Sequence, residues 1–231
     1  MGKNSLSQTL RANRHWWLLL YVPFYLTWFF VLERLITSDY WVCYLPIDDA
    51  IPFLEVFVVP YVLWYPFMIV MGLFLLLRDI PAFVRYMWFL IFGFSFCLLF
   101  YMLVPNGQDL RPDTFARDNL LVRLVQRLYS VDTNTNVFPS MHVVGSIAVA
   151  YAVFDSDRLR NAWLRAVTVL LAAVISVSIL FVKQHSALDL IGALVLCVPI
   201  WLGLWRWRHV SRLRMDAAAG QAAAEEPSAA E

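Results

Sequence analysis

Six long apolar stretches, separated by short polar segments, constrain the fold of this chain more than any other feature. A helix needs about 20 mostly apolar residues to cross the hydrocarbon core of a bilayer. The runs cover residues 16–33, 56–77, 83–104, 138–154, 163–182 and 187–205. Because 61% of the 231 residues are hydrophobic and only 15% are charged, the composition departs from that of soluble domains. We therefore expect an all-α, polytopic membrane protein, a bundle of six transmembrane helices embedded in the lipid bilayer.

Net charge and cysteine usage exclude two classes of protein. The formal net charge is +1, whereas a nucleic-acid-binding protein concentrates Lys and Arg on one face, so we expect no nucleic-acid partner. The three cysteines, Cys43, Cys97 and Cys197, are an odd number without metal-ligand spacing. They indicate packing, and no disulfide framework.

The distribution of Lys and Arg predicts the orientation in the membrane. With the amino terminus inside, twelve cations fall in cytoplasmic segments and six fall outside, which places both termini in the cytoplasm of a cell-membrane protein. The twelve are Lys3, Arg11, Arg14, Arg78, Arg85, Arg158, Arg160, Arg165, Arg206, Arg208, Arg212 and Arg214, and the six are Arg34, Arg111, Arg117, Arg123, Arg127 and Lys183. Four of the six outer cations lie in one loop, residues 105–137, which is therefore a candidate functional region.

The chain divides into two parts of unequal length. Residues 1–216 form the predicted membrane-embedded domain. Residues 217–231 are an Ala-rich, low-complexity tail with no apolar face to bury, and we expect this tail to be cytoplasmic and disordered.

The loop 105–137 contains a predicted turn and a predicted helix. Its first residues, Pro105-Asn106-Gly107-Gln108, have the chemistry of a turn. Asp118 can then cap a helix with one apolar face and with Arg123 and Arg127 on another face. The apolar residues are Leu120, Leu121, Leu124, Val125 and Leu128. Such a helix either lies on the membrane surface or packs on the outer ends of the spans.

A first candidate site follows the loop, in the sequence Phe138-Pro139-Ser140-Met141-His142. Proline suits the first turn of a helix, so Ser140 and His142 should lie near the amino terminus of the fourth span. Free N–H groups and the helix dipole favour an anion there. A phosphate group fits this position.

A second candidate site opens the sixth span, where His185 precedes Asp189 by four residues. On a helix, residues four apart share a face, so Asp189 can accept a hydrogen bond from one ring nitrogen of His185. The other nitrogen is then free to attack an electrophile, as in the aspartate–histidine half of a nucleophilic triad. A carboxylate inside an apolar run costs about 2.5–3.5 kcal/mol on insertion scales, which marks function or a partner.

The predicted topology brings these sites to one side of the membrane. Two whole spans separate His142 from His185, and the loop with Arg111 leads directly into the His142 span. All three residues are therefore predicted on the outer side.

The quoted motifs resemble those of the type 2 phosphatidic acid phosphatase superfamily. The segment 138–142 is similar to the P-S-G-H motif of that family, and His185 with Asp189 is similar to the H-x-x-x-D end of its third motif. Arg111-Pro112 resembles the R-P that closes its first motif, K-x-x-x-x-x-x-R-P. The resemblance covers residues 55–205 and extends to motif order and the six-span layout.

This resemblance implies a role for each matching residue. His185 would be the nucleophile that forms a phosphohistidine, oriented by Asp189. His142 would be the general acid for the leaving alcohol and then the base for water, while Arg111 and Ser140 would hold phosphate oxygens. The family implies no metal and no other cofactor.

The sequence departs from the family pattern at three positions. The first-motif lysine falls at Val104, the glycine between Ser and His is Met141, and the third-motif arginine falls at Ile179. Nearby cations can replace the two missing ones, because the transition state of phosphoryl transfer needs positive charge. The candidates are Lys183, Arg117, Arg123 and Arg127, of which we favour Lys183 because it lies two residues from His185.

Several functions therefore stay open on sequence alone. The leading hypothesis is a phosphatase acting on a lipid phosphate or diphosphate at the outer leaflet. The second is a phosphotransferase with an alcohol acceptor, since the motifs are also similar to those of the inositol phosphorylceramide synthase branch. The third is a non-catalytic lipid binder or transporter. A metal site from His142, His185 and Asp189 is least favoured, because their positions do not fix ligand geometry, and the oligomeric state stays open.

Overall fold

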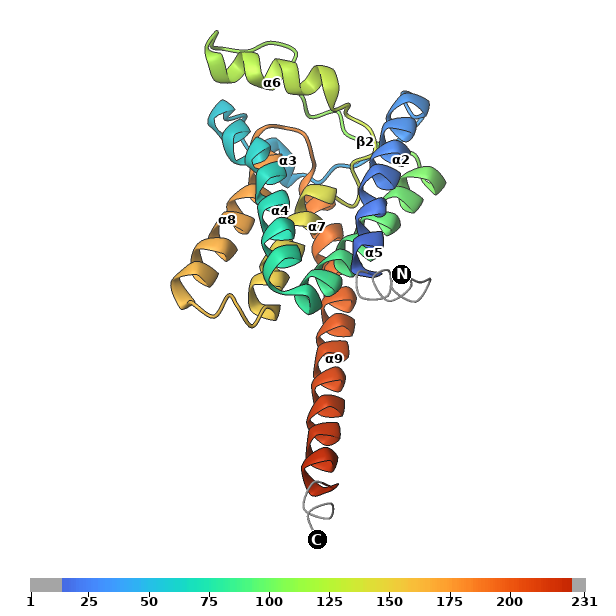
Figure 1. Cartoon of the computed structure of the whole chain (residues 1–231). Coiled ribbons are helices and arrows are strands. Elements are labelled where there is room, and N and C mark those ends of the chain that lie inside the picture. Colours follow the sequence, from blue (N-terminus) through green and yellow to red (C-terminus); the bar gives the residue numbers. More distant parts are fainter. Residues whose placement is uncertain (1–13, 226–231) are drawn as a thin grey trace, which may run out of the picture.

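The structure is a computed structural model that describes residues 14–225. Lys3 and Arg11, two of the predicted cytoplasmic cations, and the end of the predicted tail, residues 226–231, lie outside the described part. Within it the fold is all-α apart from one small sheet (Figure 1). The elements in chain order are η1 (Arg14–Leu20), α2 (Tyr21–Leu35), β1 (Trp41–Val42), α3 (Ile47–Ala50), η2 (Glu55–Phe57), α4 (Val58–Arg78), α5 (Ile80–Leu103), β2 (Asn106–Gly107), α6 (Leu120–Val131), α7 (Met141–Asp155), α8 (Ala162–Phe181) and α9 (Ala187–Glu225).

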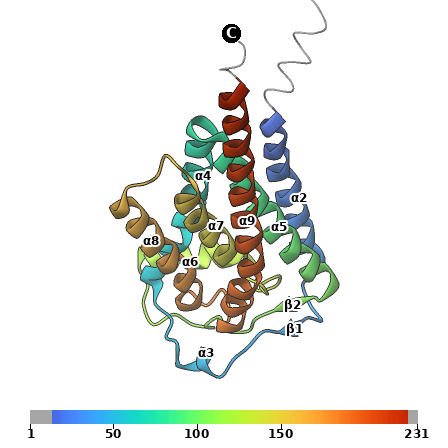
Figure 2. The ribbon, with the colours of Figure 1, turned by 90° about the horizontal axis from the view of Figure 1, so that it is seen from below.

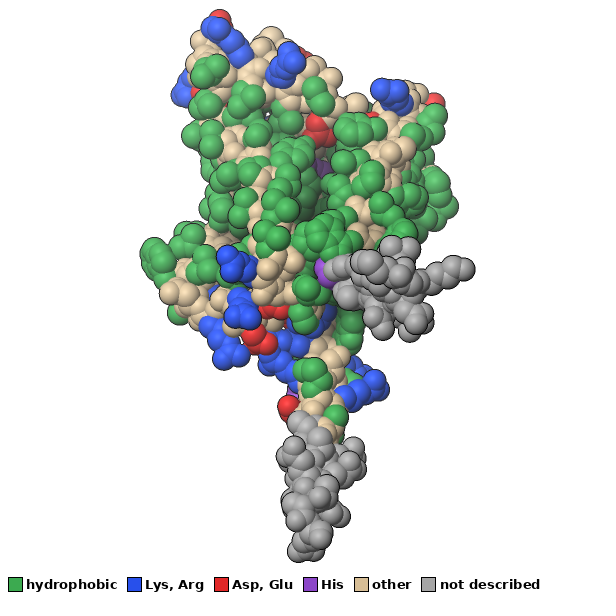
Figure 3. Space-filling model, in the orientation of Figure 1, with side chains coloured by type: hydrophobic (Ala, Val, Ile, Leu, Met, Phe, Trp, Pro, Cys, Tyr) green, Lys and Arg blue, Asp and Glu red, His purple; other side chains and the backbone are tan. Residues whose placement is uncertain are grey.

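Five helices in the described residues are long and apolar enough to cross a membrane. They are His15–Leu35, Glu55–Arg78, Ile80–Leu103, Ala162–Phe181 and Ala187–Ala218. Between 11% and 50% of their most apolar windows is buried inside the protein, so most of this apolar surface faces outward. Hydrophobic side chains cover the middle of the molecule in Figure 3, with Lys and Arg towards both ends. The chain is a multi-pass membrane protein.

The predicted span at residues 138–154 is the shorter apolar helix α7, of 15 residues. Twelve of these residues are buried, and α7 contacts α4, α5, α8 and α9. A helix that is apolar on all sides is a buried helix, which accounts for its central place in the bundle (Figure 2). The helix that begins at the Ser140–His142 motif is therefore the core of the fold.

The short elements β1, α3, η2 and β2 lie with α6 at one end of the bundle. The start of α2 and the end of α9 lie at the opposite end (Figures 1 and 2). At the α6 end, β1 and β2 pair in parallel, with Trp41 opposite Asn106 and Val42 opposite Gly107. The predicted turn at residues 105–108 is wrong, because Asn106–Gly107 is this strand. Gly107 is needed for close approach, since a Cβ there would lie 2.6 Å from the ring of Tyr40.

Helix α6 packs on the bundle, which is the second of the two arrangements considered from the sequence. Val122 and Val125 are buried, and α6 contacts η2 and α4. Its cap is Asn119, which accepts a hydrogen bond from the N–H of Val122 at 3.0 Å. The predicted cap Asp118 is therefore wrong; its carboxylate instead pairs with Arg123 at 3.0 Å.

Helix α9 runs to Glu225, past the boundary at residue 216 predicted for a disordered tail. Alanine has the highest helix propensity of the amino acids, and alanines dominate the sequence beyond residue 216. The missing apolar face, on which the expectation of disorder rested, does not prevent a helix in such an alanine-rich segment. In Figure 1, α9 projects well beyond the other helices.

Candidate active site

His185 and Asp189 meet at the start of α9. The Nδ1 atom of His185 lies 3.1 Å from Oδ2 of Asp189, so the predicted contact is present. Its predicted origin inside a helix is wrong, because α9 begins at Ala187 and His185 precedes it. Asp189 instead reaches back across the first turn and also accepts the backbone N–H of Ser186 at 3.0 Å. This is the geometry of a capping box, in which the third helical residue satisfies the N–H of the capping residue.

Asp48, in the short helix α3, fixes the start of α9. Its Oδ2 accepts the hydroxyl of Ser186 at 2.5 Å, and its Oδ1 accepts the N–H of Ala187 at 2.8 Å. Asp48 is buried. A carboxylate is favourable at a helix amino terminus, where the backbone N–H groups are otherwise unpaired. Sequence reasoning missed this residue, because the pair Asp48-Asp49 lies far along the chain from the helix that it caps.

Cys43 lies beside Asp189. Burial, followed by the Asp189 carboxylate, raises the pKa of the Cys43 thiol, so the thiol stays protonated at neutral pH. All three cysteines are free and buried, which agrees with the packing role predicted for them. Cys43 therefore places an uncharged side chain beside the carboxylate that contacts His185.

Ser140 and His142 approach His185 from α7. Ser140 caps α7 without a side-chain hydrogen bond to the helix, and its Oγ lies 3.5 Å from Nε2 of His185. His142 is the second residue of α7, and its ring centroid lies 5.9 Å from that of His185. The prediction that Ser140 and His142 lie at this helix amino terminus is confirmed. The two motifs, 43 residues apart between the histidines, form one site.

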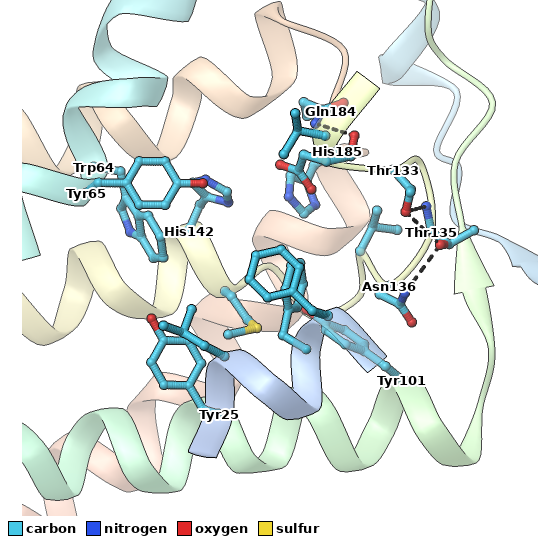
Figure 4. Close-up of a pocket in the computed structure, with 17 residues that line it drawn as sticks. Tyr25, Trp64, Tyr65, Tyr101, Thr133, Thr135, Asn136, His142, Gln184 and His185 are labelled. Atoms are coloured by element: carbon cyan, nitrogen blue, oxygen red, sulfur yellow. Dashed lines mark hydrogen bonds between the residues drawn. The ribbon is translucent and has the colours of Figure 1, made fainter. Parts of the chain in front are cut away.

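A cavity of about 120 Å³ opens beside both histidines. Its polar lining consists of Asp132, Thr133, Thr135, Asn136, His142, Gln184 and His185, and its other lining residues are Tyr25, Leu26, Phe29, Phe30, Trp64, Tyr65, Tyr101, Val131, Val137 and Met141. Figure 4 shows His185 and Gln184 on one side of the cavity and His142 with Trp64 and Tyr65 on another. A histidine side chain is visible in the hollow of the space-filling view (Figure 3). The cavity can hold a polar group against two imidazoles and an apolar group against α2 and α4.

Arg111 lies directly behind the cavity lining. Its guanidinium donates to Oε1 of Gln184 at 2.5 Å and to the carbonyl of Asp132 at 2.7 Å, and it stacks on the ring of Tyr129 at 4.2 Å. Burial lowers the pKa of Arg111, but an arginine stays a cation at neutral pH. The structure thus brings Arg111 into contact with Gln184, the residue before His185. Its guanidinium N–H groups donate to oxygen atoms of the protein.

The structure does not bring Lys183 into the cavity. Its ammonium donates to the carbonyl of Asp48 at 2.8 Å, and burial lowers its pKa. The three other replacement candidates also lie elsewhere: Arg117 pairs with Glu55, Arg123 pairs with Asp118, and Arg127 is exposed on α6. Among the described residues, no Lys or Arg lines the cavity.

Glu33 is a further residue that sequence reasoning missed. It lies at the end of α2, is buried, and accepts hydrogen bonds from the Thr133 N–H at 3.0 Å, the Thr133 hydroxyl at 2.5 Å and the Asn136 amide at 2.7 Å. These bonds tie α2 to the segment that leads into Ser140. In the sequence, Glu33 marks only the end of an apolar run, so its partners a hundred residues later were not visible.

Comparison with known protein families matches one part of the chain. Residues 105–213 match the family model of the PAP2 superfamily, which is the type 2 phosphatidic acid phosphatase superfamily. No curated protein and no solved structure matches the chain. The matched range contains Arg111, Ser140, His142, His185 and Asp189, and the superfamily implies phosphatase or phosphotransferase activity on phosphate esters. Residues 105–213 of this multi-pass membrane protein are thus a PAP2 superfamily domain.

Proposed function

We propose that this protein is a membrane lipid phosphatase that removes phosphate from a lipid phosphate or diphosphate through a phosphohistidine intermediate. One observation carries the proposal. His185 has Nδ1 on the Asp189 carboxylate and Nε2 beside Ser140, at the wall of a cavity that His142 also lines. One nitrogen of the nucleophile is thus engaged and the other is available.

In the first step, the lone pair on Nε2 of His185 attacks phosphorus and the bond from phosphorus to the ester oxygen breaks. Asp189 holds the proton on Nδ1 and stabilises the positive charge that develops on the ring. His142, in its protonated form, gives its proton to the leaving oxygen. The products of this step are the free lipid alcohol and a phosphohistidine.

In the second step, water attacks the phosphohistidine. His142, now neutral, takes a proton from this water, and the bond between phosphorus and Nε2 breaks. Inorganic phosphate leaves and His185 is regenerated. His142 thus serves as acid and then as base, which restores its protonation state over one turnover.

Phosphate oxygens are held, in this proposal, by Ser140, by the N–H groups at the start of α7 and by Arg111. The support is that the Ser140 side chain makes no capping hydrogen bond and that His142 is the second residue of α7. Arg111 contacts Gln184, which lines the cavity. Lys183 is kept as a phosphate ligand in the proposal, although its ammonium must leave the Asp48 carbonyl to act.

The site is proposed to face the outside of the cell membrane, with six spans and both termini cytoplasmic. The cation distribution supports this orientation. Helix α7 would be the fourth span in chain order, added to the five longer helices. Its 15 residues rise about 22 Å, short of the roughly 30 Å core, but non-helical backbone is tolerated where it is buried in protein. The lipid tail would lie along Phe29 and Phe30 of α2, which line the cavity.

The experiment is phosphate release by the purified protein in detergent. A panel of lipid phosphates and diphosphates is offered to the wild type and to His185→Ala, with water alone or with an added alcohol such as inositol. We expect phosphate release by the wild type and none by His185→Ala. Formation of a phosphorylated alcohol without phosphate release would assign the phosphotransferase instead. Tight lipid binding with neither product would assign a non-catalytic binder.

A further inference from the structure

The ring of His142 is held by aromatic contacts. Its centroid lies 4.3 Å from that of Tyr61 and 4.4 Å from that of Trp64. Within the described residues, its buried Nε2 has no hydrogen-bond partner. A histidine of a catalytic site is commonly oriented by a carboxylate or carbonyl, as His185 is by Asp189. The orientation of His142 therefore depends on these two rings, which we name the aromatic pair.

The first ring of the aromatic pair is anchored at its hydroxyl. Tyr61 is fully buried, and its Oη donates to Oδ2 of Asp132 at 2.5 Å. Asp132 follows the last residue of α6, and its carbonyl accepts from Arg111. The Tyr61 ring, against which His142 packs, is thus held by Asp132, the residue that also accepts a hydrogen bond from Arg111.

The second ring lies against the backbone of α7, where a glycine makes room for it. Trp64 follows Tyr61 by three residues on α4, so the two rings share a face. Gly145 follows His142 by three residues on α7. A Cβ at Gly145 would lie 2.7 Å from Nε1 of Trp64 and 2.5 Å from Sδ of Met68. Only glycine leaves room for the indole in this position.

We propose that Tyr61 and Trp64 are positioning residues for proton transfer by His142. This inference rests on the proposed role of His142 as acid and base. Two rings packed on an imidazole limit its rotation, so the proton that it carries is directed to the leaving oxygen. A displacement of about 1 Å at a catalytic group can cost about 10²-fold in rate.

The test uses two substrates that differ in their need for an acid. One is the phosphate monoester of an alkyl alcohol. The other is the phosphate monoester of a nitrophenol that carries the same alkyl chain on its ring, and its nitrophenolate leaves without protonation. The measured quantity is the rate of phosphoenzyme formation in a single turnover with the full chain in detergent. The variants are Tyr61→Leu, Trp64→Leu, Gly145→Ala and, as benchmark, His142→Ala.

For the alkyl phosphate, we expect each leucine variant of the aromatic pair, and Gly145→Ala, to lower the rate of phosphoenzyme formation by about 10–10²-fold. This loss is no larger than the roughly 10²–10⁴-fold that a general acid supplies. The nitrophenyl phosphate should change by less than about 3-fold. Tyr61→Phe and Trp64→Phe keep a ring, so they should also slow the alkyl phosphate reaction more than the nitrophenyl phosphate reaction, but by a smaller factor. These two variants also decide the question if a leucine variant does not fold.

The matched control is Tyr86→Leu. Tyr86 is another buried tyrosine, and its hydroxyl donates to the Met68 carbonyl at 3.1 Å. Among the described residues, the rings packed beside His142 are those of Tyr61, Trp64, Tyr65 and His185. Loss of packing there should affect both substrates alike. Equal slowing of both substrates in the Tyr61 and Trp64 variants, with leaving-group dependence in His142→Ala alone, would overturn the inference. No such dependence in His142→Ala would instead overturn the proposed role of His142, and the inference with it.

Discussion

Nδ1 of His185 and the N–H of Ser186 share one oxygen atom, Oδ2 of Asp189, at 3.1 Å and 3.0 Å. The carboxylate that orients the proposed nucleophile is therefore also the cap of α9. Because the two tasks use one atom, the start of the last helix and the tautomer of His185 are coupled. A change at Asp189 should affect catalysis and the local fold together.

Asp189→Asn should separate these tasks. The amide oxygen can still accept the Ser186 N–H, but it carries no charge to support the His185 imidazolium. The equivalent change in a serine-protease triad lowers kcat by about 10⁴, so we expect a loss of up to that size with the protein still folded. The measurement is kcat in detergent beside a thermal unfolding curve. Unchanged kcat in a folded Asp189→Asn would remove this carboxylate from catalysis.

Lys183→Ala should weaken phosphate binding and slow transfer if Lys183 moves from the Asp48 carbonyl to the substrate. Arg123→Ala is the control, because Arg123 pairs with Asp118 on the exposed face of α6. We expect a rise in KM for Lys183→Ala and little change for Arg123→Ala. Near-neutral effects of both changes would count against Lys183 as the replacement cation.

The pH dependence gives a second test of Lys183. Burial lowers the pKa of this lysine below its ordinary value, so its charge is lost at a lower pH than that of an exposed lysine as the pH rises. Phosphate binding should weaken over that alkaline range, and Lys183→Arg should extend binding to higher pH. The measurement is KM against pH for the two proteins. Superimposable alkaline limbs would show that the charge of residue 183 does not act on phosphate.

The orientation can be tested by labelling intact cells with an impermeant maleimide. The native cysteines are buried, so single substitutions at exposed positions report the side directly. Thr114→Cys, in the loop before α6, should react from outside, and Arg158→Cys, between α7 and α8, should react only after the cells are opened. The reverse pattern would place the active site on the cytoplasmic face.

Activity should be the same with and without a chelator. A nitrogen nucleophile and cationic side chains supply the chemistry in the proposed mechanism, so no divalent ion is required. Phosphate release by purified protein is measured before and after treatment with the chelator. Activity lost to the chelator and restored by one divalent ion would contradict the mechanism.

The sequence predicted those parts of the site that depend on short spacing. His185 with Asp189, and Ser140 with His142, are close in the chain, and each pair lies at a helix start. The helices followed from apolar length, although α7 is shorter than a typical span because it is enclosed by four other helices. Local spacing and apolar content were therefore sufficient to predict most of the helices.

Contacts between distant segments could not be predicted in the same way. The pairing of β1 with β2 made a strand where Gly107 suggested a turn, because two chain segments about sixty residues apart meet there. Lys183 lies close to His185 in sequence, yet it points to Asp48. Glu33, at the end of α2, and Asp48, in α3, support the site although they precede their partners by about a hundred residues or more. Nothing in their local sequence indicates these partners.

The two histidines have different tasks in the mechanism, so their variants should differ. His185→Ala removes the atom that bonds to phosphorus and should abolish turnover. His142→Ala removes the acid and base, which contribute roughly 10²–10⁴-fold. It should be slow but still able to form phosphoenzyme from a substrate with a good leaving group.

The most direct measurement is acid-labile phosphate on the protein after rapid quench with a lipid diphosphate or an aryl phosphate. The wild type and His142→Ala should carry this phosphate, and His185→Ala should carry none. Phosphoenzyme that persists in His185→Ala would contradict the assignment of His185 as the nucleophile.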